Sequence, residues 1–329
     1  LEELESKDLN CFFQDITQVS NEKKTTALDA IPNRIGGRYS SVESVSYCHY
    51  AANNPIEDKF DIKYFSNNKN TGMFLSVLDG HGGDEASSFA NERLFHYFNN
   101  YLSVMSSMYN KIPLNKYSRE VTERNLFYSI LKLVFSLVET EFRKEALRLF
   151  EAGNKKISTV GTCVLITIVY NDNVYVANLG DAKARLFRKN EYIVGRSDST
   201  TYESIKLMHR HNASKKREQA RLSKLFPNDS DIFICKDEDN TLCYVKGRLQ
   251  VTRALGDFYL KDKIFTSPYM RKYTYFNGPY LLAEPEILIY TFDPKHQDKY
   301  LLLATDGVGD FLSSQLIAEM IGEKEQEDR

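Results

Sequence analysis

The sequence predicts an α+β fold in which antiparallel sheets are covered by helices. Strand-like segments and helical segments come in blocks and do not alternate regularly along the chain. This order favours the α+β class over a doubly wound parallel sheet. A length of 329 residues with 42% apolar residues is enough for one large core, and no internal repeat is evident. We expect an N-terminal extension, residues 1–36, packed on the surface or partly disordered, followed by one domain, residues 37–329.

The first part of the domain is predicted to contain two strands and two long helices. Apolar residues at roughly alternating positions indicate a strand over 38–51, and the apolar run in "MFLSVLDG" (73–80) indicates a buried one. From Asp84 onward apolar residues recur every four positions, which predicts a helix with Asp84 as its N-cap. A second helix is predicted over 125–150, ended by Gly153.

The second part begins with a β-rich stretch. Residues 160–187 read as strands, with a hairpin turn at 171–173. The segment "YLLLATDG" (300–307) is predicted to be another buried strand, and residues 313–323 a closing helix.

Charge and hydropathy give no sign of a nucleic-acid or membrane partner. The chain carries 43 Lys and Arg against 45 Asp and Glu and contains no apolar stretch of transmembrane length, and we expect no signal peptide. The basic stretch 209–222 is interpreted as a solvated helix face in preference to a phosphate-binding patch. We expect a monomer.

The five cysteines are scattered and form neither a C-x-x-C pair nor a zinc-binding spacing. This pattern indicates a reduced intracellular protein, with Cys163 as a small core residue. We expect a cytoplasmic or nuclear location. A mitochondrial location is the alternative if a targeting segment precedes Leu1, since the sequence does not start with Met.

Three apolar strands end in the same way, at Asp79, Asp181 and Asp306, each next to a glycine. One Asp-Gly or Gly-Asp pair alone usually marks a turn, but three at the ends of buried strands suggest a shared site. Converging carboxylates repel one another unless a cation lies between them. A site with only oxygen ligands favours Mg²⁺ or Mn²⁺ over zinc.

Such a site suits hydrolysis of a phosphate ester, because a hard divalent ion activates water and neutralises phosphate oxygens. His81, close to Asp79, is a candidate general acid, although a lone histidine is more often structural. The pair Glu57 and Asp58 follows Pro55; alone it would be a charged surface turn, but it is a candidate member of the acidic group.

Other phosphate-transfer chemistries lack their motifs in this chain. No cysteine is followed by arginine at the Cys-x5-Arg spacing, no apolar strand ends in D-x-D, and no G-N-H motif is present. A P-loop, G-x-x-x-x-G-K-[ST], is also missing, so a kinase or NTPase is not favoured.

These motifs, taken in order, resemble those of the metal-dependent Ser/Thr protein phosphatases of type 2C. The resemblance runs from about residue 50 to the end, through "VLDGHGG", "VGTCVLITIVYNDNVYVANLGDAKARLF", "VKGRLQVTRALGD", "LLAEPEI" and "LLLATDG". "ANNPIED", "HRHNAS" and "PYLLAEPEI" are most similar to the pyruvate dehydrogenase phosphatases and to a plant clade. The implied fold is a β-sandwich of two antiparallel sheets flanked by helices.

The resemblance also implies roles for single residues. Asp79 would bridge two Mg²⁺ or Mn²⁺ ions, with the Gly80 carbonyl on one of them and Asp306 as a second carboxylate ligand. Glu57 and Asp58 match a Glu-Asp pair that supports the metal-bound waters.

His81 matches the proposed general acid, and a metal-bound water would attack without a covalent intermediate. Asp181 and Asp310 match positions that hold a third, weaker metal ion. The region between "HRHNAS" and "VKGRLQ" would include a flap beside the cleft.

The chain departs from the family pattern at two places. Asn53 stands where many members have a phosphate-binding arginine; asparagine donates a hydrogen bond without a positive charge, so it would hold phosphate more weakly. The family's last metal-binding aspartate has no counterpart, because only Asp310 and Asp328 follow Asp306. We therefore expect this sequence to lack the last strand or strands of the domain.

The resemblance implies an Mg²⁺- or Mn²⁺-dependent phosphoprotein Ser/Thr phosphatase, with a phosphoprotein as its partner. The alternative is a pseudophosphatase, a binding or scaffold module on the same fold, which the missing aspartate favours and the intact Asp79 and Asp306 do not. A small-molecule phosphatase would use the same metal core.

Overall fold

The computed structural model describes residues 42, 44–49, 54–67, 70–109, 111, 115–190, 201–265, 276–292 and 297–327. The α-helices are α3 (Glu85–Tyr109), α4 (Lys116–Glu151), α5 (Lys216–Leu225), α6 (Asp306–Gly309) and α7 (Ser314–Glu327). The strands are β1 (Lys59–Asn67), β2 (Asn70–His81), β3 (Gly161–Tyr170), β4 (Asn173–Leu179), β5 (Lys183–Asn190), β6 (Thr201–Lys206), β7 (Phe233–Cys235), β8 (Cys243–Val245), β9 (Leu255–Gly256), β10 (Glu286–Thr291) and β11 (Asp298–Ala304). Short 3-10 helices are η1 (Lys155–Thr159), η2 (Phe258–Leu260) and η3 (Lys263–Phe265).

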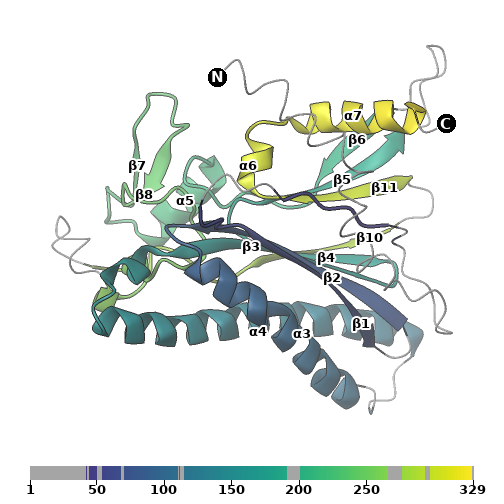
Figure 1. The fold of residues 1–329 in the computed structure, drawn as a ribbon, viewed down its shortest axis with the longest axis horizontal. Coiled ribbons are helices and arrows are strands. Elements are labelled where there is room, and N and C mark those ends of the chain that lie inside the picture. Colours follow the sequence, from purple (N-terminus) through teal and green to yellow (C-terminus); the bar gives the residue numbers. More distant parts are fainter. Residues whose placement is uncertain are drawn as a thin grey trace.

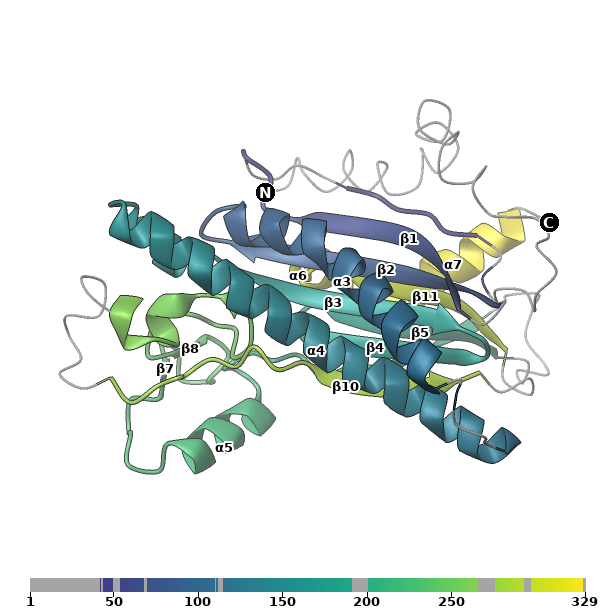
Figure 2. The same cartoon turned by 90° about the horizontal axis from the view of Figure 1, so that it is seen from below.

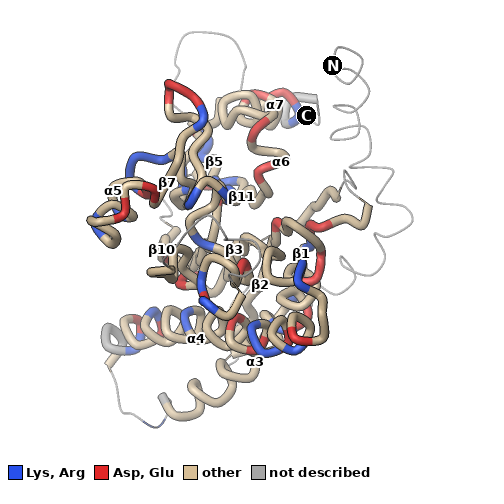
Figure 3. Tube along the Cα trace, turned by 90° about the vertical axis from the view of Figure 1, so that its left-hand side faces the viewer, with Lys and Arg blue, Asp and Glu red and all other residues tan. Residues whose placement is uncertain are grey.

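Two antiparallel sheets lie face to face, and helices cover their outer faces. The larger sheet has the order β1-β2-β3-β4-β10, with β9 paired to β3, and the smaller has the order β11-β5-β6. Helices α3 and α4 lie below the larger sheet and α7 lies above the smaller one (Figures 1 and 3). The predicted α+β sandwich is therefore confirmed.

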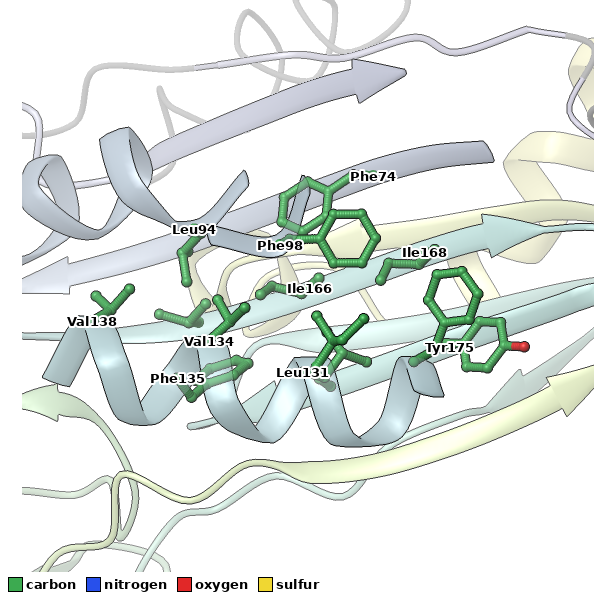
Figure 4. Packing of buried hydrophobic residues seen from close by; sticks show 14 of the residues in the cluster. Phe74, Leu94, Phe98, Leu131, Val134, Phe135, Val138, Ile166, Ile168 and Tyr175 are labelled. Carbon is green, nitrogen blue, oxygen red and sulfur yellow. The ribbon is translucent and has the colours of Figure 1, made fainter. Parts of the chain in front are cut away.

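Strand β3 lies at the centre of the packing, because both of its faces are covered. All ten of its residues are buried. Ile166 and Ile168 face helices α3 and α4, where they pack with Phe74, Phe98 and Leu131 (Figure 4). The aromatic side chains in this layer contact one another closely, and the burial of such large apolar side chains is the main stabilisation of the helix-covered face.

The second apolar layer fills the space between the two sheets. Leu165 and Val169 of β3 point to this side and pack with Val176 of β4 and Leu186 of β5. The two faces of β3 thus alternate with the period of two that a strand imposes. This layer fixes the spacing of the sheets, and with it the separation of the residues at their ends.

Most predicted elements are confirmed. Helix α3 starts immediately after Asp84, α4 spans the predicted range 125–150 and extends further at its start, and Gly153 with a φ of 105° follows its end. The hairpin between β3 and β4 turns through residues 171 and 172, and Tyr170 pairs with Asn173. Strand β11 and helix α7 occupy the last two predicted positions. The prediction that the strand is buried is wrong, because β11 lies at the edge of the smaller sheet and only Ala304 of its residues is buried.

The strand predicted over 38–51 is wrong for its described part, because residues 42 and 44–49 form no strand. Val42 and Val45 instead pack as irregular chain against the layer between the sheets, and the Tyr47 ring lies 4.7 Å from the Phe60 ring, centroid to centroid. The alternation reflected this one-sided packing and not a place in a sheet.

A smaller unit lies between β6 and β9 in the sequence. It contains α5 and the hairpin of β7 and β8, which lie beside the end of the sandwich (Figures 1 and 2). Cys235 and Cys243 face each other in this hairpin and form a disulfide. The prediction that the cysteines are reduced is wrong for this pair, so the cysteine pattern no longer supports a reducing compartment.

Within the described ranges, no helix combines the length and apolar character that a membrane span requires.

Replacing Phe98 with alanine tests the packing of α3 on the larger sheet. The Phe98 side chain is fully buried, with ring centroids of Phe65 and Phe74 at 5.0 and 5.2 Å. We expect Phe98→Ala to lower the free energy of unfolding by about 3–5 kcal/mol in urea denaturation, because it leaves a cavity. The control on the same helix is Val104→Ala, where Val104 is 59% exposed, and its effect should stay within about 0.5 kcal/mol. Equal effects of the two changes would contradict the packing described here.

Candidate active site

Three strands from both sheets bring acidic side chains to one end of the sandwich. Asp79 lies near the end of β2. Asp181 comes two residues after the end of β4, and Asp306 comes two residues after the end of β11, at the start of α6. One carboxylate oxygen from each of these residues lies within 4.8 Å of the others. The structure thus brings together the three aspartates that the sequence placed at strand ends. Figure 3 views this end of the molecule.

Backbone and side-chain hydrogen bonds hold the cluster in place. The backbone N–H of Asp306 donates to Asp79 Oδ2 at 3.1 Å, which links the ends of the two sheets. Asp79 stands opposite Cys163 in the ladder of β2 and β3. The Cys163 thiol donates a hydrogen bond to Asp181 Oδ1, with 3.5 Å between the sulfur and the oxygen. Asn212 Nδ2 donates to the other oxygen, Asp181 Oδ2, at 2.9 Å.

Burial and repulsion from neighbouring carboxylates raise the pKa of Asp79 and of Asp306. Burial is the largest cause at Asp79, followed by the charges of Asp306 and Asp58, and together they raise its pKa to about 8. Burial and the charge of Asp181 also raise the pKa of Asp306. A cluster of partly buried carboxylates with this much repulsion fits a divalent cation, and its oxygen donors suit Mg²⁺ or Mn²⁺. Asp79, Asp306 and Asp181 are the residues that would hold it.

The predicted pair Glu57 and Asp58 lies next to the cluster, in the segment before β1. Burial raises the pKa of Asp58, although hydrogen bonds from the Thr305 side chain and the Gly80 backbone act in the opposite direction. The Glu57 carbonyl accepts a hydrogen bond from Ser87 Oγ at 2.5 Å. A Cβ at Gly80 would lie 2.4 Å from this carbonyl oxygen, so glycine is needed there for the two segments to approach.

His81 forms a pair with an aspartate that the sequence did not single out. His81 Nε2 lies 2.8 Å from Asp257 Oδ2, and Asp257 is fully buried. Burial lowers the pKa of His81, but the charge of Asp257 and the hydrogen bond outweigh burial, and the pKa is raised. A Cβ at Gly161 would lie 2.0 Å from Asp257 Oδ2 and 2.6 Å from His81 Nε2, so only glycine leaves room for the pair.

Of two further predicted residues, one lies at the edge of the cluster and the other outside the described residues. Asp310 is 57% exposed, and its Oδ1 accepts a hydrogen bond from Arg210 Nη1 at 3.1 Å. Asn53 lies outside the described residues. The neighbouring turn does line a surface hollow, together with the start of α3; its lining residues are Asn54, Pro55, Glu57, Gly83, Asp84, Glu85 and Lys156.

A short segment after β6 supports the cluster and was misinterpreted from the sequence. Residues 210–212 begin the basic stretch read as a solvated helix face, but α5 starts only at Lys216. His211 is fully buried, its backbone N–H donates to the Gly180 carbonyl at 2.8 Å, and its Nδ1 accepts the Gly180 N–H at 3.1 Å. This geometry leaves Nε2 as the donor to Glu286 Oε2 at 3.0 Å, so the imidazole is neutral. His211 therefore fixes the backbone that carries Asp181.

A repeated tripeptide was the signal for Asp257. Leu-Gly-Asp occurs at 179–181 and again at 255–257, and both glycines have positive φ, 124° at Gly180 and 77° at Gly256. Such a glycine lets the chain turn sharply at a strand end, so that the following aspartate points back into the site. The first aspartate joins the acidic cluster and the second holds His81.

Several known proteins are similar to this chain. The family profile described as protein phosphatase 2C matches residues 42–329. The chain is 31% identical over 278 residues to "Probable protein phosphatase 2C 67" of Arabidopsis thaliana, which covers 82% of this chain and 66% of that protein. It is 30% identical over 278 residues to "Probable protein phosphatase 2C 64" of the same plant, covering 82% and 62%. The chain thus spans about two thirds of the relatives it matches.

A solved structure with the same fold is that of serine-threonine phosphatase 2C from Toxoplasma gondii. It superimposes with a TM-score of 0.57 at 18% identity, covering 83% of this chain and 80% of that one.

Replacing Asp79 with asparagine should stabilise the protein when metal is absent. The pKa of Asp79 is raised to about 8, so between about pH 4 and pH 8 the folded state binds a proton that the unfolded state releases, and stability falls as pH rises. We expect Asp79→Asn to exceed the wild type by roughly 3 kcal/mol in urea denaturation at pH 8 with EDTA. In millimolar Mn²⁺ the order should reverse, because the wild type binds the ion more tightly.

The matched control is Asp172→Asn, an exposed carboxylate in the hairpin at the opposite end of β3. It should leave both stabilities unchanged. A loss of stability in Asp79→Asn with EDTA would contradict the repulsion described here.

Proposed function

The chain belongs to the protein phosphatase 2C family, and on that premise we propose that it is a divalent-metal-dependent hydrolase of phosphoserine and phosphothreonine in proteins. The observation that carries the proposal is the approach of three carboxylate oxygens, from Asp79, Asp181 and Asp306, to within 4.8 Å. Without a cation this arrangement is unfavourable, and a site that had lost its catalytic function would have no physical reason to keep it.

Bound Mg²⁺ or Mn²⁺ would supply the Lewis-acid chemistry, making water a better nucleophile at phosphorus and neutralising the phosphate oxygens. The protein's part is to fix the ligands. Asp79 and Asp306 are held relative to each other by their backbone-to-carboxylate hydrogen bond. Asp58 lies near enough for its charge to raise the pKa of Asp79, so its carboxylate would accept hydrogen bonds from waters around the ions.

His81 is proposed as the general acid. Asp257 holds one ring nitrogen at 2.8 Å and raises the pKa of His81, which keeps the imidazolium available at neutral pH. The ring would give its proton to the serine or threonine oxygen as the bond to phosphorus breaks. Asp257 is a positioning residue, because it acts through the histidine.

The segment before β1 is proposed to help bind the substrate. Asn53 would donate a hydrogen bond to the phosphate in place of an arginine. The adjacent hollow also carries the cation of Lys156 beside the acids Glu57, Asp84 and Glu85, so a peptide chain leaving the phosphate would meet both signs of charge.

Hydrolysis of a phosphothreonine peptide in Mn²⁺ tests the proposed activity. We expect turnover that EDTA abolishes and that Asp306→Asn reduces by at least about 1000-fold in kcat/KM, because one ligand to the ions is lost. Asp172→Asn, in the distant hairpin, should match the wild type. If folded protein with bound Mn²⁺ hydrolyses neither this peptide nor p-nitrophenyl phosphate, the chain is a binding or scaffold module on a phosphatase fold.

The role of His81 is tested by comparing two leaving groups. Threonine leaves as a strongly basic alkoxide that needs a proton, whereas p-nitrophenolate leaves without one. We expect His81→Asn to lower kcat by about 100-fold for the phosphothreonine peptide and by less than about 5-fold for p-nitrophenyl phosphate. Asp257→Asn should follow the same pattern more weakly. An equal loss for both substrates would argue against a general acid at this position.

A further inference from the structure

Arg210 lies between two carboxylates at the edge of the acidic cluster. Its Nη2 is 3.6 Å from Asp181 Oδ2, and its Nη1 is 3.1 Å from Asp310 Oδ1. The side chain is only 20% exposed, and a guanidinium carries a permanent positive charge. Asp181 and Asp310 are the two positions that the resemblance assigns to a third, weaker metal ion. In this chain a cationic side chain already lies between them.

Its neighbours in the sequence keep Arg210 in this position. His211 is anchored to Gly180 by two hydrogen bonds, and Asn212 donates to the same oxygen of Asp181 that Arg210 approaches. These contacts hold the backbone of residues 210–212 beside the end of β4, from where the Arg210 side chain reaches both carboxylates.

A second cation lies on the same side. Lys183 Nζ donates to the Gly309 carbonyl, one residue before Asp310. The turn that carries Asp310 is therefore held by two positively charged side chains, Lys183 and Arg210. A divalent ion bound there would meet the repulsion of both at short range.

We propose that Arg210 is a fixed counter-cation for Asp181 and Asp310 and takes the place of a third metal ion at this position. The inference deepens the proposed function and rests on it, because it concerns how many ions the same site holds. Asp181 would then remain one of the residues that could hold the ion with Asp79 and Asp306, with part of its charge balanced by the guanidinium, and Asp310 would serve as a partner of the arginine.

The test is to count bound Mn²⁺ by equilibrium dialysis, with electron paramagnetic resonance of the free ion as the readout. We expect Arg210→Gln to bind one more Mn²⁺ per chain than the wild type. The double variant with Arg210→Gln and Asp310→Asn should lose this extra ion, and Asp310→Asn alone should bind as many ions as the wild type. The control Arg217→Gln removes an exposed arginine paired with Glu286 and should bind as many as the wild type.

The inference fails if Arg210→Gln gains no ion, or if Asp310→Asn alone loses one. Should Arg210→Gln not fold, the single change at Asp310 still decides, because that residue is exposed and its replacement leaves the core intact. Failure of the proposed function would look different: the wild type would then bind no Mn²⁺ at all, whatever the variants at Arg210 bind.

Discussion

Repulsion between carboxylates that the sandwich does not allow to separate is the constraint on which the site depends. Asp79 comes from the larger sheet and Asp306 from the smaller one, so their distance is set by the apolar layer between the sheets and by a hydrogen bond across them. Both residues are partly buried, so water screens their charges incompletely. The folded state therefore stores unfavourable electrostatic energy, which a divalent cation would remove.

The surrounding chain is built to keep this arrangement. The segment before β1 approaches Gly80 so closely that a side chain there would not fit. The pair of His81 and Asp257 approaches Gly161 in the same way. Two Leu-Gly-Asp turns direct one aspartate to the acidic cluster and another to the histidine. Two neighbouring residues support Asp181 in different ways. The neutral His211 fixes the backbone at Gly180, and the charged Arg210 balances the negative charge of Asp181. Stability away from the site comes from the packing of α3 and α4 on the larger sheet.

Much of this was predictable from the sequence, because strong local patterns decide it. Apolar runs that end in aspartate predicted the grouping of Asp79, Asp181 and Asp306, and the helical period predicted α3 and α4. Strand β1 was not predicted, although Lys59, Asp61 and Lys63 alternate with apolar residues, and the false strand over 38–51 has a similar alternation. Alternation shows that one side of a segment is covered, and it does not show whether another strand or a loop covers it.

The supporting residues of the site were hidden for a different reason. Arg210 matters through its contact with Asp310, 100 positions away, and no local pattern records such a contact. The contact of Asp257 with His81 spans 176 positions, and only the repeated Leu-Gly-Asp tripeptide is a local sign of it. The disulfide between Cys235 and Cys243 forms because the register of the short β7–β8 hairpin places these residues opposite each other. Composition and cysteine spacing do not reveal this register. Length and charge alone suggested that the basic stretch 209–222 is a solvated helix face. The role of this segment instead depends on its place in the fold, where His211 is buried.

Locating manganese directly tests the central claim, that the aspartates at the strand ends are the ligands of a divalent cation. A crystal of this chain soaked in Mn²⁺ and measured at the manganese absorption edge would give an anomalous difference map. The account predicts a peak within coordination distance, about 2.2 Å, of Asp79 and Asp306 oxygens, and no peak between Asp181 and Asp310. A well-ordered map without a peak at Asp79, or with the strongest peak elsewhere on the surface, would contradict it.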